Sequence, residues 1–161
     1  TDPDELSWPL PNVWLGVSVE AQDVAWRLDW LVKTPAAVRF VSAEPLIGPL
    51  DLMPWLWEDA GPAWAGQNPS PDLDWVIVGG ESGAGARPMD LGWARSIVVQ
   101  GRDARCPVFV KQLGSRWSRE TGSKNSKGGD FMEWPLDLRV RQFPESPRPA
   151  GAGQLMMTLA D

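Results

Sequence analysis

Four short apolar runs divide the chain, and a charged residue or a glycine follows each one. β-Branched residues are frequent in these runs, and polar residues do not alternate regularly with apolar ones. This pattern is typical of strands that are buried on both faces, as in a parallel sheet. The runs cover residues 13–19, 37–43, 73–79 and 107–110, and the last closes on Lys111 and Gln112.

Two longer stretches between these runs have the 3.6-residue period of an amphipathic helix. Asp23 is a candidate N-cap for a helix that continues to Lys33 and is ended by Pro35. Asp90 is a candidate N-cap for a second helix that continues to about Ala104. The residues expected on the buried faces are Val24, Leu28, Leu31 and Val32 in the first helix and Leu91, Ala94, Ile97 and Val98 in the second.

The order of these elements predicts an α/β fold. Strand, helix and strand are followed by an irregular excursion over one end of the sheet, with a short helical piece within 50–57, and then by strand, helix and strand. Such an order implies parallel strands with right-handed crossovers. Four strands do not close a barrel, so the sheet must be covered or completed by another segment or chain. We expect an α/β body at 8–118 and a short irregular extension at 119–161.

Charged residues gather where the predicted strands end. Glu20, Glu44 and Glu81 follow the first three strands, and Lys111 closes the fourth. In parallel α/β folds, ligands bind at the carboxyl ends of the strands. Buried charges are rarely retained for stability alone, because desolvation offsets much of their mutual attraction. The sequence therefore predicts a ligand site on this rim.

The third strand runs into a glycine-rich loop at 79–83. The loop lacks the Lys-Ser/Thr pair of a phosphate-binding P-loop, and the carboxylate of Glu81 would oppose a phosphate. A cationic or hydroxyl-bearing ligand suits it better. The alternative is a tight turn between strand and helix with no ligand.

Composition excludes several kinds of site. The chain has no His, so it cannot form a Ser-His-Asp triad, a Cys-His pair or a histidine-ligated metal centre. Cys106 is its one cysteine, and we expect an inert, partly buried thiol. The chain has 11 Trp and no Tyr, and we expect most of the tryptophans to pack inside the protein. The single cysteine favours a reducing cytoplasm, and the acidic start is not that of a signal peptide. No segment approaches the roughly 20 apolar residues of a membrane span.

Charge is distributed unevenly. Residues 1–110 contain 7 Lys and Arg against 15 Asp and Glu, whereas residues 111–160 contain 8 against 5. The acidic body argues against broad duplex binding, which depends on neutralised phosphates. The basic C-terminal third could contact a nucleic acid, or it could be a solvated face.

Several blocks of the sequence resemble the phage-associated three-cysteine-motif proteins of phages and bacteria. Their fold is similar to that of radical S-adenosylmethionine (SAM) enzymes such as spore photoproduct lyase. The resemblance covers about residues 8–143. The blocks are Asn12 to Glu20, Phe40 to Leu46, Trp75 to Gly83, Ala86 to Met89, Phe109 to Gln112, Lys127 to Asp130, Trp134-Pro135 and Asp137 to Arg141.

The resemblance implies a partial, half TIM-like barrel of parallel strands. The family's three cysteines, which would hold an iron–sulfur cluster, lie upstream of the block that begins at Asn12, and this chain starts after them. A cluster would then come only from a missing N-terminal segment or half. The implied function is to supply the rim for SAM-dependent radical modification of a nucleic acid or nucleotide, in the host cytoplasm if the protein is phage-encoded. The residues expected to hold SAM are Gly79, Gly80, Glu81, Ser82 and Glu20, and those expected to face the substrate in catalysis are Glu44, Lys111 and Gln112.

Other interpretations stay open. The chain could be a non-catalytic binding or assembly module that docks on a cluster-bearing partner or self-associates. It could also be a hydrolase whose carboxylates bind a divalent metal. Glu44 could form a salt bridge with Lys111 or Arg87, and Arg87 could bind an anion or hold its loop in place. Residues 127–130 are expected to form a turn, with a flap over the site as the alternative.

Overall fold

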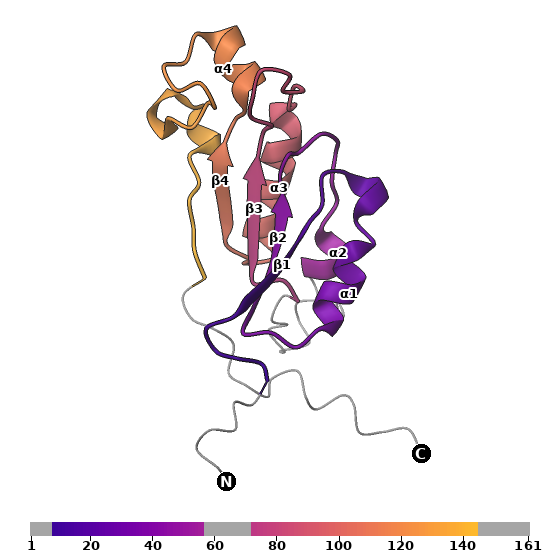
Figure 1. Cartoon of the computed structure of the whole chain (residues 1–161). Coiled ribbons are helices and arrows are strands. Elements are labelled where there is room, and N and C mark those ends of the chain that lie inside the picture. Colours follow the sequence, from indigo (N-terminus) through magenta and orange to yellow (C-terminus); the bar gives the residue numbers. More distant parts are fainter. Residues whose placement is uncertain (1–7, 57–71, 145–161) are drawn as a thin grey trace, which may run out of the picture.

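A four-stranded parallel sheet forms the centre of the molecule. The computed structural model describes residues 8–56 and 72–144. The spatial order of the strands is the same as their order in the chain, and all neighbours are parallel (Figure 1). The predicted α/β class and parallel strands are thus confirmed. The strands are β1 (Trp14–Ser18), β2 (Val38–Ala43), β3 (Trp75–Gly79) and β4 (Val108–Gln112).

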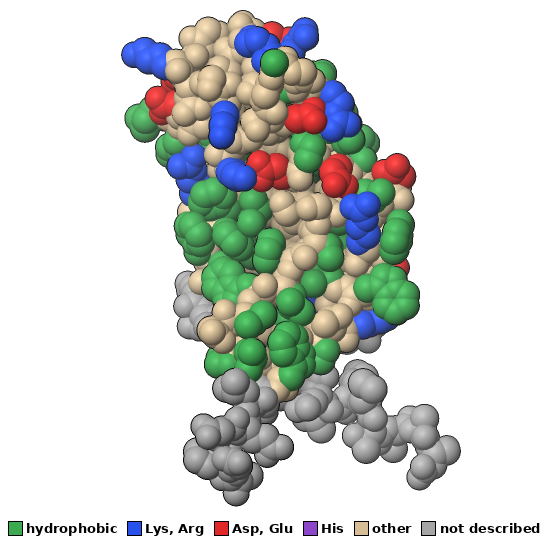
Figure 2. Space-filling view, viewed as in Figure 1, with side chains coloured by type: hydrophobic (Ala, Val, Ile, Leu, Met, Phe, Trp, Pro, Cys, Tyr) green, Lys and Arg blue, Asp and Glu red, His purple; other side chains and the backbone are tan. Residues whose placement is uncertain are grey.

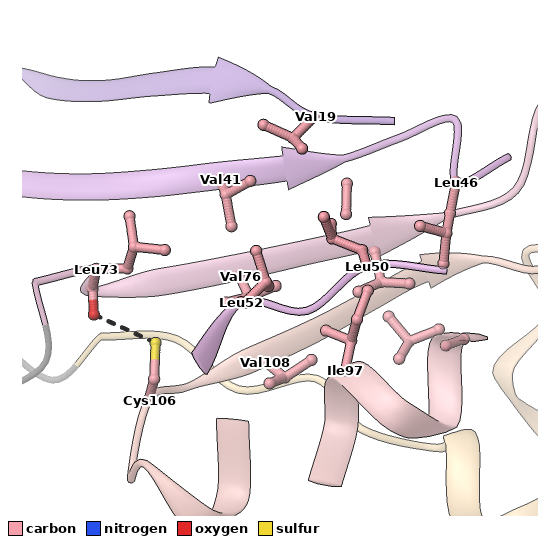
Figure 3. Packing of buried hydrophobic residues seen from close by; sticks show 14 of the residues in the cluster. Val19, Val41, Leu46, Leu50, Leu52, Leu73, Val76, Ile97, Cys106 and Val108 are labelled. Carbon is pink, nitrogen blue, oxygen red and sulfur yellow. Dashed lines mark hydrogen bonds between the residues drawn. The ribbon is translucent and has the colours of Figure 1, made fainter. Parts of the chain in front are cut away.

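One face of the sheet is covered and carries the core. Val41, Val76 and Val108 lie in one row across the strands and are fully buried or nearly so. Ile97 of α3 (Leu91–Asp103) lies against this row in Figure 3. Leu28 of α1 (Arg27–Lys33) belongs to the same apolar cluster. Burial of large aliphatic side chains contributes about 1.5–3 kcal/mol each, so this layer supplies most of the fold's stability. The helices are α1 (Arg27–Lys33), α2 (Met53–Leu56), α3 (Leu91–Asp103) and α4 (Ser115–Thr121).

The other face of the sheet is lined by aromatic side chains and is only partly covered. Trp75 lies at its centre, with ring centroids of Trp14, Phe40, Phe109 and Phe143 between 5.2 and 6.0 Å away. Figure 2 shows hydrophobic side chains gathered over the strands on this side. The prediction that the strands are buried on both faces is therefore wrong for this face, because α1, α2 and α3 pack on the opposite one.

The two edges of the sheet differ. Val110 N–H donates to Val140 O (2.8 Å), and Gln142 N–H donates to Val108 O (2.9 Å), so the C-terminal segment lies antiparallel along β4. Among the described residues, no strand pairs with the outer edge of β1. Among the described residues, the edge of β1 is therefore open for a further strand, whereas that of β4 is covered.

Of the two predicted N-caps, one is confirmed and the other is wrong. Asp90 is the N-cap of α3, and its carboxylate accepts a hydrogen bond from Gly92 N–H (2.7 Å). Asp23 is not an N-cap, because it lies inside a 3-10 turn and α1 begins only at Arg27. The side chain of Gln22 accepts a hydrogen bond from Asp51 N–H (2.7 Å) and holds this turn against the loop after β2.

The excursion after β2 packs against the helices within its described part. Leu46, Leu50, Leu52 and Leu56 are buried in the core. The Gln100 side chain accepts from Leu52 N–H (2.6 Å) and donates to Leu50 O (3.0 Å), which ties this segment to α3. The rest of the predicted excursion, at 57–71, lies outside the described residues.

The C-terminal extension packs back on the sheet. Trp134 and Leu138 join the core, and the predicted boundary at residue 118 lies within α4. The prediction for 127–130 is confirmed as a turn, since Gly128 has φ +63° and donates its N–H to Asn125 O (2.8 Å). The tail at 145–161 lies outside the described residues.

The expectation that most tryptophans pack inside the protein is confirmed in part within the described residues, where Trp55, Trp93 and Trp117 pack against the core. Trp134 is buried there, but four other tryptophans are exposed. Trp14 has 41% of its surface exposed, and Trp30 has 68%. Trp30 lies on the solvent side of α1, whereas Trp14 belongs to the aromatic face. The exposed tryptophans are Trp8, Trp14, Trp26 and Trp30.

Candidate functional site

The strand ends form a rim of alternating charges. Each predicted carboxylate lies beside a cation from the same chain. Glu20 pairs with Arg27 (3.2 Å), Glu44 with Lys111 (3.0 Å), and Glu81 with an arginine in its own loop. Figure 2 shows this band of acidic and basic side chains along the ends of the strands, next to the hydrophobic face. The sequence thus located the acidic residues of the rim correctly.

Glu81 and Arg87 form the strongest pair. Arg87 donates from Nε to Oε2 (2.8 Å), from Nη2 to Oε1 (2.9 Å) and from its backbone N–H to Oε2 (2.7 Å). These hydrogen bonds lower the pKa of Glu81 from its ordinary value of 4.5 to about 2. Bidentate arginine–carboxylate pairs fix geometry as well as charge. Arg87 therefore holds the loop after β3 in place, which is one of the two roles expected for it.

Glu44 and Lys111 pair across the strand that separates them. Lys111 Nζ donates to Glu44 Oε2, and the interaction spans β3 at Gly79. A Cβ atom on Gly79 would lie 3.0 Å from Glu44 Cδ, so the glycine leaves space for this carboxylate. The salt bridge expected as the alternative for Glu44 is thus present, with Lys111 as the partner. It does not exclude ligand binding, since Lys111 is half exposed.

Glu20 is held by a residue that sequence reasoning missed. Arg27, the first residue of α1, donates from Nη1 to Ser18 O (2.8 Å) and to Glu20 Oε2 (3.2 Å). Glu20 also contributes to the raised pKa of Arg87, whose main cause is the pair with Glu81. Arg27 lies seven residues after Glu20, within the predicted helix, and this basic residue was the signal that could have identified the partner. The charges at the ends of β1 and β3 therefore act on one another.

Two rim oxygens keep acceptor capacity. Glu20 Oε1 and Glu44 Oε1 accept no hydrogen bond from the residues that the structure describes, because Arg27 and Lys111 both bind Oε2. Both side chains are partly accessible to solvent. A cationic or hydroxyl-bearing ligand can bind these oxygens without breaking either ion pair.

Gly79, Gly80 and Gln112 serve the packing of the rim. Gly79 O accepts from Leu46 N–H (2.9 Å), and a Cβ on Gly80 would lie 2.4 Å from Leu113 O. The Gln112 side chain is buried and donates to Gly80 O (2.9 Å). These contacts join the loop after β3 to the end of β4, and the buried Gln112 amide is engaged in this packing. Ser82 is exposed at the loop tip.

The hydrolase interpretation would need a site for a divalent metal ion. Within residues 8–56 and 72–144, no cluster of three or more His, Cys, Asp or Glu could hold a metal ion. Cys106 is buried, and its thiol donates to Leu73 O (3.3 Å), as drawn in Figure 3. The burial expected for this thiol is therefore confirmed. None of the described helices is long and apolar enough to cross a membrane.

Comparison with known proteins gives a single family. A family model described as a protein of unknown function, DUF5131, matches residues 1–139. No curated protein matches the chain, and no solved structure matches it.

Proposed function

The chain belongs to the DUF5131 family, and we propose that it supplies the ligand-binding rim of a radical-SAM-like protein. In this proposal, SAM lies across the strand ends, and the substrate is a nucleic acid or nucleotide. The barrel implied by the resemblance is completed by a segment that also brings the iron–sulfur cluster. The observation that carries the proposal is the rim of paired carboxylates at the ends of three adjacent parallel strands.

The chemistry of the rim suits SAM. Its amino group and sulfonium are cationic, and its ribose carries two hydroxyl groups, so carboxylate acceptors match it. Glu20 Oε1 and Glu44 Oε1 have acceptor capacity for these groups, and Ser82 adds an exposed hydroxyl. The ionised carboxylate of Glu81, held in place by Arg87, adds negative charge to the same rim. Arg87 and Lys111 can face the carboxylate of the same ligand. Bound SAM would supply radical chemistry through reductive cleavage of a carbon–sulfur bond.

The residues of this chain do not fit an iron–sulfur cluster. Such clusters are held by several cysteine thiolates, whereas this chain has Cys106 alone, and its thiol is buried between strands. The residues of this chain bind and orient the ligand, and a cluster-bearing segment or partner would complete the site.

A completing segment could pair with the sheet at one of its two edges. The edge of β4 is covered by residues 140–142, whereas the edge of β1 is open among the described residues. Strands of a completing segment would therefore pair with β1, and the aromatic face would become the inside of a partial barrel. Parallel sheets are ordinarily covered on both faces, which supports this arrangement.

A second function, from a different class, is that of a non-catalytic assembly module. The partly exposed aromatic face around Trp75 favours it, because large apolar patches mark sites of association. On this interpretation the rim pairs are structural, and the chain acts by docking on a partner or on a second copy of itself.

Calorimetric titration separates the two functions. SAM and S-adenosylhomocysteine are titrated in turn into the protein. Stronger binding of SAM than of the uncharged thioether supports the proposal, because the sulfonium charge would lie near the carboxylates. Equal affinities, or no binding of either compound at millimolar concentration, would favour the assembly module.

A further inference from the structure

A basic depression lies beside the rim, outside the residues that the proposed function uses. It has a volume of about 630 Å³ and is open to solvent. The loop after β3 forms one wall with Gly83 and Ala84, and α4 and the turn that follows it form the other. Figure 2 shows Lys and Arg side chains around this end of the molecule, where α4 lies in Figure 1. A volume of this size fits a nucleotide.

Its cationic side chains have no acidic partners within the described part of the chain. Arg119, Lys124 and Lys127 line the depression, and none of them takes part in the salt bridges found there. The neighbouring acids are engaged elsewhere. Glu120 pairs with Arg116 (2.5 Å), and Glu133 accepts from Ser123 Oγ and from Lys124 N–H. Three cations therefore face one open space in a chain of net charge −6.

The walls of the depression are fixed by hydrogen bonds. Ser118 Oγ donates to Asn125 O (2.7 Å), and the Asn125 side chain accepts from Lys127 N–H (3.0 Å) and Gly129 N–H (3.0 Å). These bonds hold the turn that carries both lysines against α4. The backbone that carries both lysines is therefore already ordered, so binding of a ligand needs to order only their side chains.

A second set of bonds joins this site to the rim. Ser115 Oγ accepts from Gly83 N–H (3.1 Å), and Arg119 Nη1 donates to Gly83 O (3.2 Å). Gly83 is two residues from Glu81, so the depression and the rim share one loop. Arg119 keeps its other guanidinium N–H groups for a ligand.

We propose that this depression binds a phosphate group of a nucleic-acid strand. Cationic side chains that form no salt bridge suit phosphate oxygens, which accept charge-assisted hydrogen bonds. The acidic body of the chain and the size of the site favour local contact with a single strand over broad duplex binding. The inference rests on the proposed function in one respect: it places the substrate backbone beside the SAM-binding rim.

The test uses fluorescence anisotropy of a labelled single-stranded DNA oligonucleotide. The variant Lys124→Gln/Lys127→Gln is compared with the wild-type protein between about 50 and 200 mM salt. Because each lost contact with a single strand lowers the salt slope by about 0.7, the double variant should lose about 1.4 from the slope. We expect its affinity at low salt to fall at least about tenfold. An unchanged affinity and slope would overturn the proposal.

A matched control removes the same charge elsewhere. Lys33 is the last residue of α1 and Arg102 lies in the last turn of α3, both at the opposite end of the sheet from the rim. The variant Lys33→Gln/Arg102→Gln should change the affinity for DNA less than about twofold. If it lost as much affinity as Lys124→Gln/Lys127→Gln, binding would depend only on net charge. Lys124→Arg/Lys127→Arg should retain binding. AMP and an unlabelled strand are then compared as competitors at equal phosphate concentration. If AMP displaces the labelled strand as effectively as the unlabelled strand does, the ligand is a mononucleotide and the strand proposal fails.

The outcomes distinguish this site from the SAM site. SAM binding is measured on the Lys124→Gln/Lys127→Gln variant as well. Loss of DNA binding with unchanged SAM binding supports two adjacent sites. If the wild-type protein binds DNA through these lysines but never binds SAM, the phosphate site stands and the proposed function fails.

Discussion

Lys111 on β4 reaches across β3 to Glu44 at the end of β2, and the two side chains meet over Gly79. Their charged atoms are 3.0 Å apart, while 53% of the Lys111 side chain and 17% of the Glu44 side chain are exposed. The pair therefore links three strands at the rim, and it does so because the middle strand carries a glycine there. A larger side chain at Gly79 would occupy the space through which the two charged groups meet.

A double-mutant cycle measures this link. Lys111→Met, Glu44→Gln and the double variant are compared in denaturant unfolding. Because Lys111 is half exposed, we expect a coupling free energy of about 0.5–1 kcal/mol. High salt should reduce it. A coupling near zero at low salt would mean that the pair does not hold the strands together.

Gly80 should tolerate alanine far less well than Gly85 does. A Cβ on Gly80 would lie 2.4 Å from Leu113 O, whereas no atom lies within 4 Å of a Cβ on Gly85. Gly80→Ala should destabilise the fold by about 1–3 kcal/mol, which lowers the melting temperature by roughly 2–4 °C per kcal/mol. Gly85→Ala should be neutral or slightly stabilising. Equal melting temperatures for the two variants would contradict the close packing of the rim.

Acid should weaken the loop after β3 in a defined pH range. The pKa of Glu81 is lowered from 4.5 to about 2 by Arg87, so the ionised pair stabilises the folded state fully above about pH 4.5. This contribution is lost as the pH falls toward 2. NMR titration of the side-chain carboxyl should show the low pKa, and Arg87→Met should return it toward 4.5. A wild-type value near 4.5 would rule out the bidentate pair in solution.

The aromatic face should promote association. Trp14 lies on the open edge strand and contacts Trp75 edge-to-face at 5.9 Å. We expect concentration-dependent self-association in sedimentation experiments, which Trp14→Glu should reduce. Trp30→Glu, on the solvent side of α1, is the matched control and should have no effect. A wild-type protein that stays monomeric, or equal effects of both variants, would argue that this face does not associate.

The sequence was sufficient to predict the strands and the acidic residues that follow them, because both are visible in local patterns of the chain. Apolar runs gave the four strands, and Asp90 gave the start of α3. The prediction at Asp23 failed because a tertiary contact, from Gln22 to Asp51, competes with helix initiation. Local propensity does not include such contacts.

Burial was harder to predict than secondary structure. Apolar runs do not reveal that the helices cover only one face, so Trp14 and Trp75 were expected inside the protein. One cationic partner on the rim was also missed: Arg27, which pairs with Glu20. The pair of Glu44 with Lys111 was among the expected alternatives, because the strand order brings these distant residues together.

The most direct test of the central claim is SAM binding by Glu81→Gln. The substitution removes a rim charge but leaves Arg87 N–H an oxygen to bind, so the fold should stay intact. We expect calorimetric titration to show loss of SAM binding in this variant. Glu120→Gln, at a carboxylate on α4 away from the strand ends, should bind SAM like the wild-type protein. An unchanged affinity in folded Glu81→Gln would contradict the account and remove Glu81 from the site.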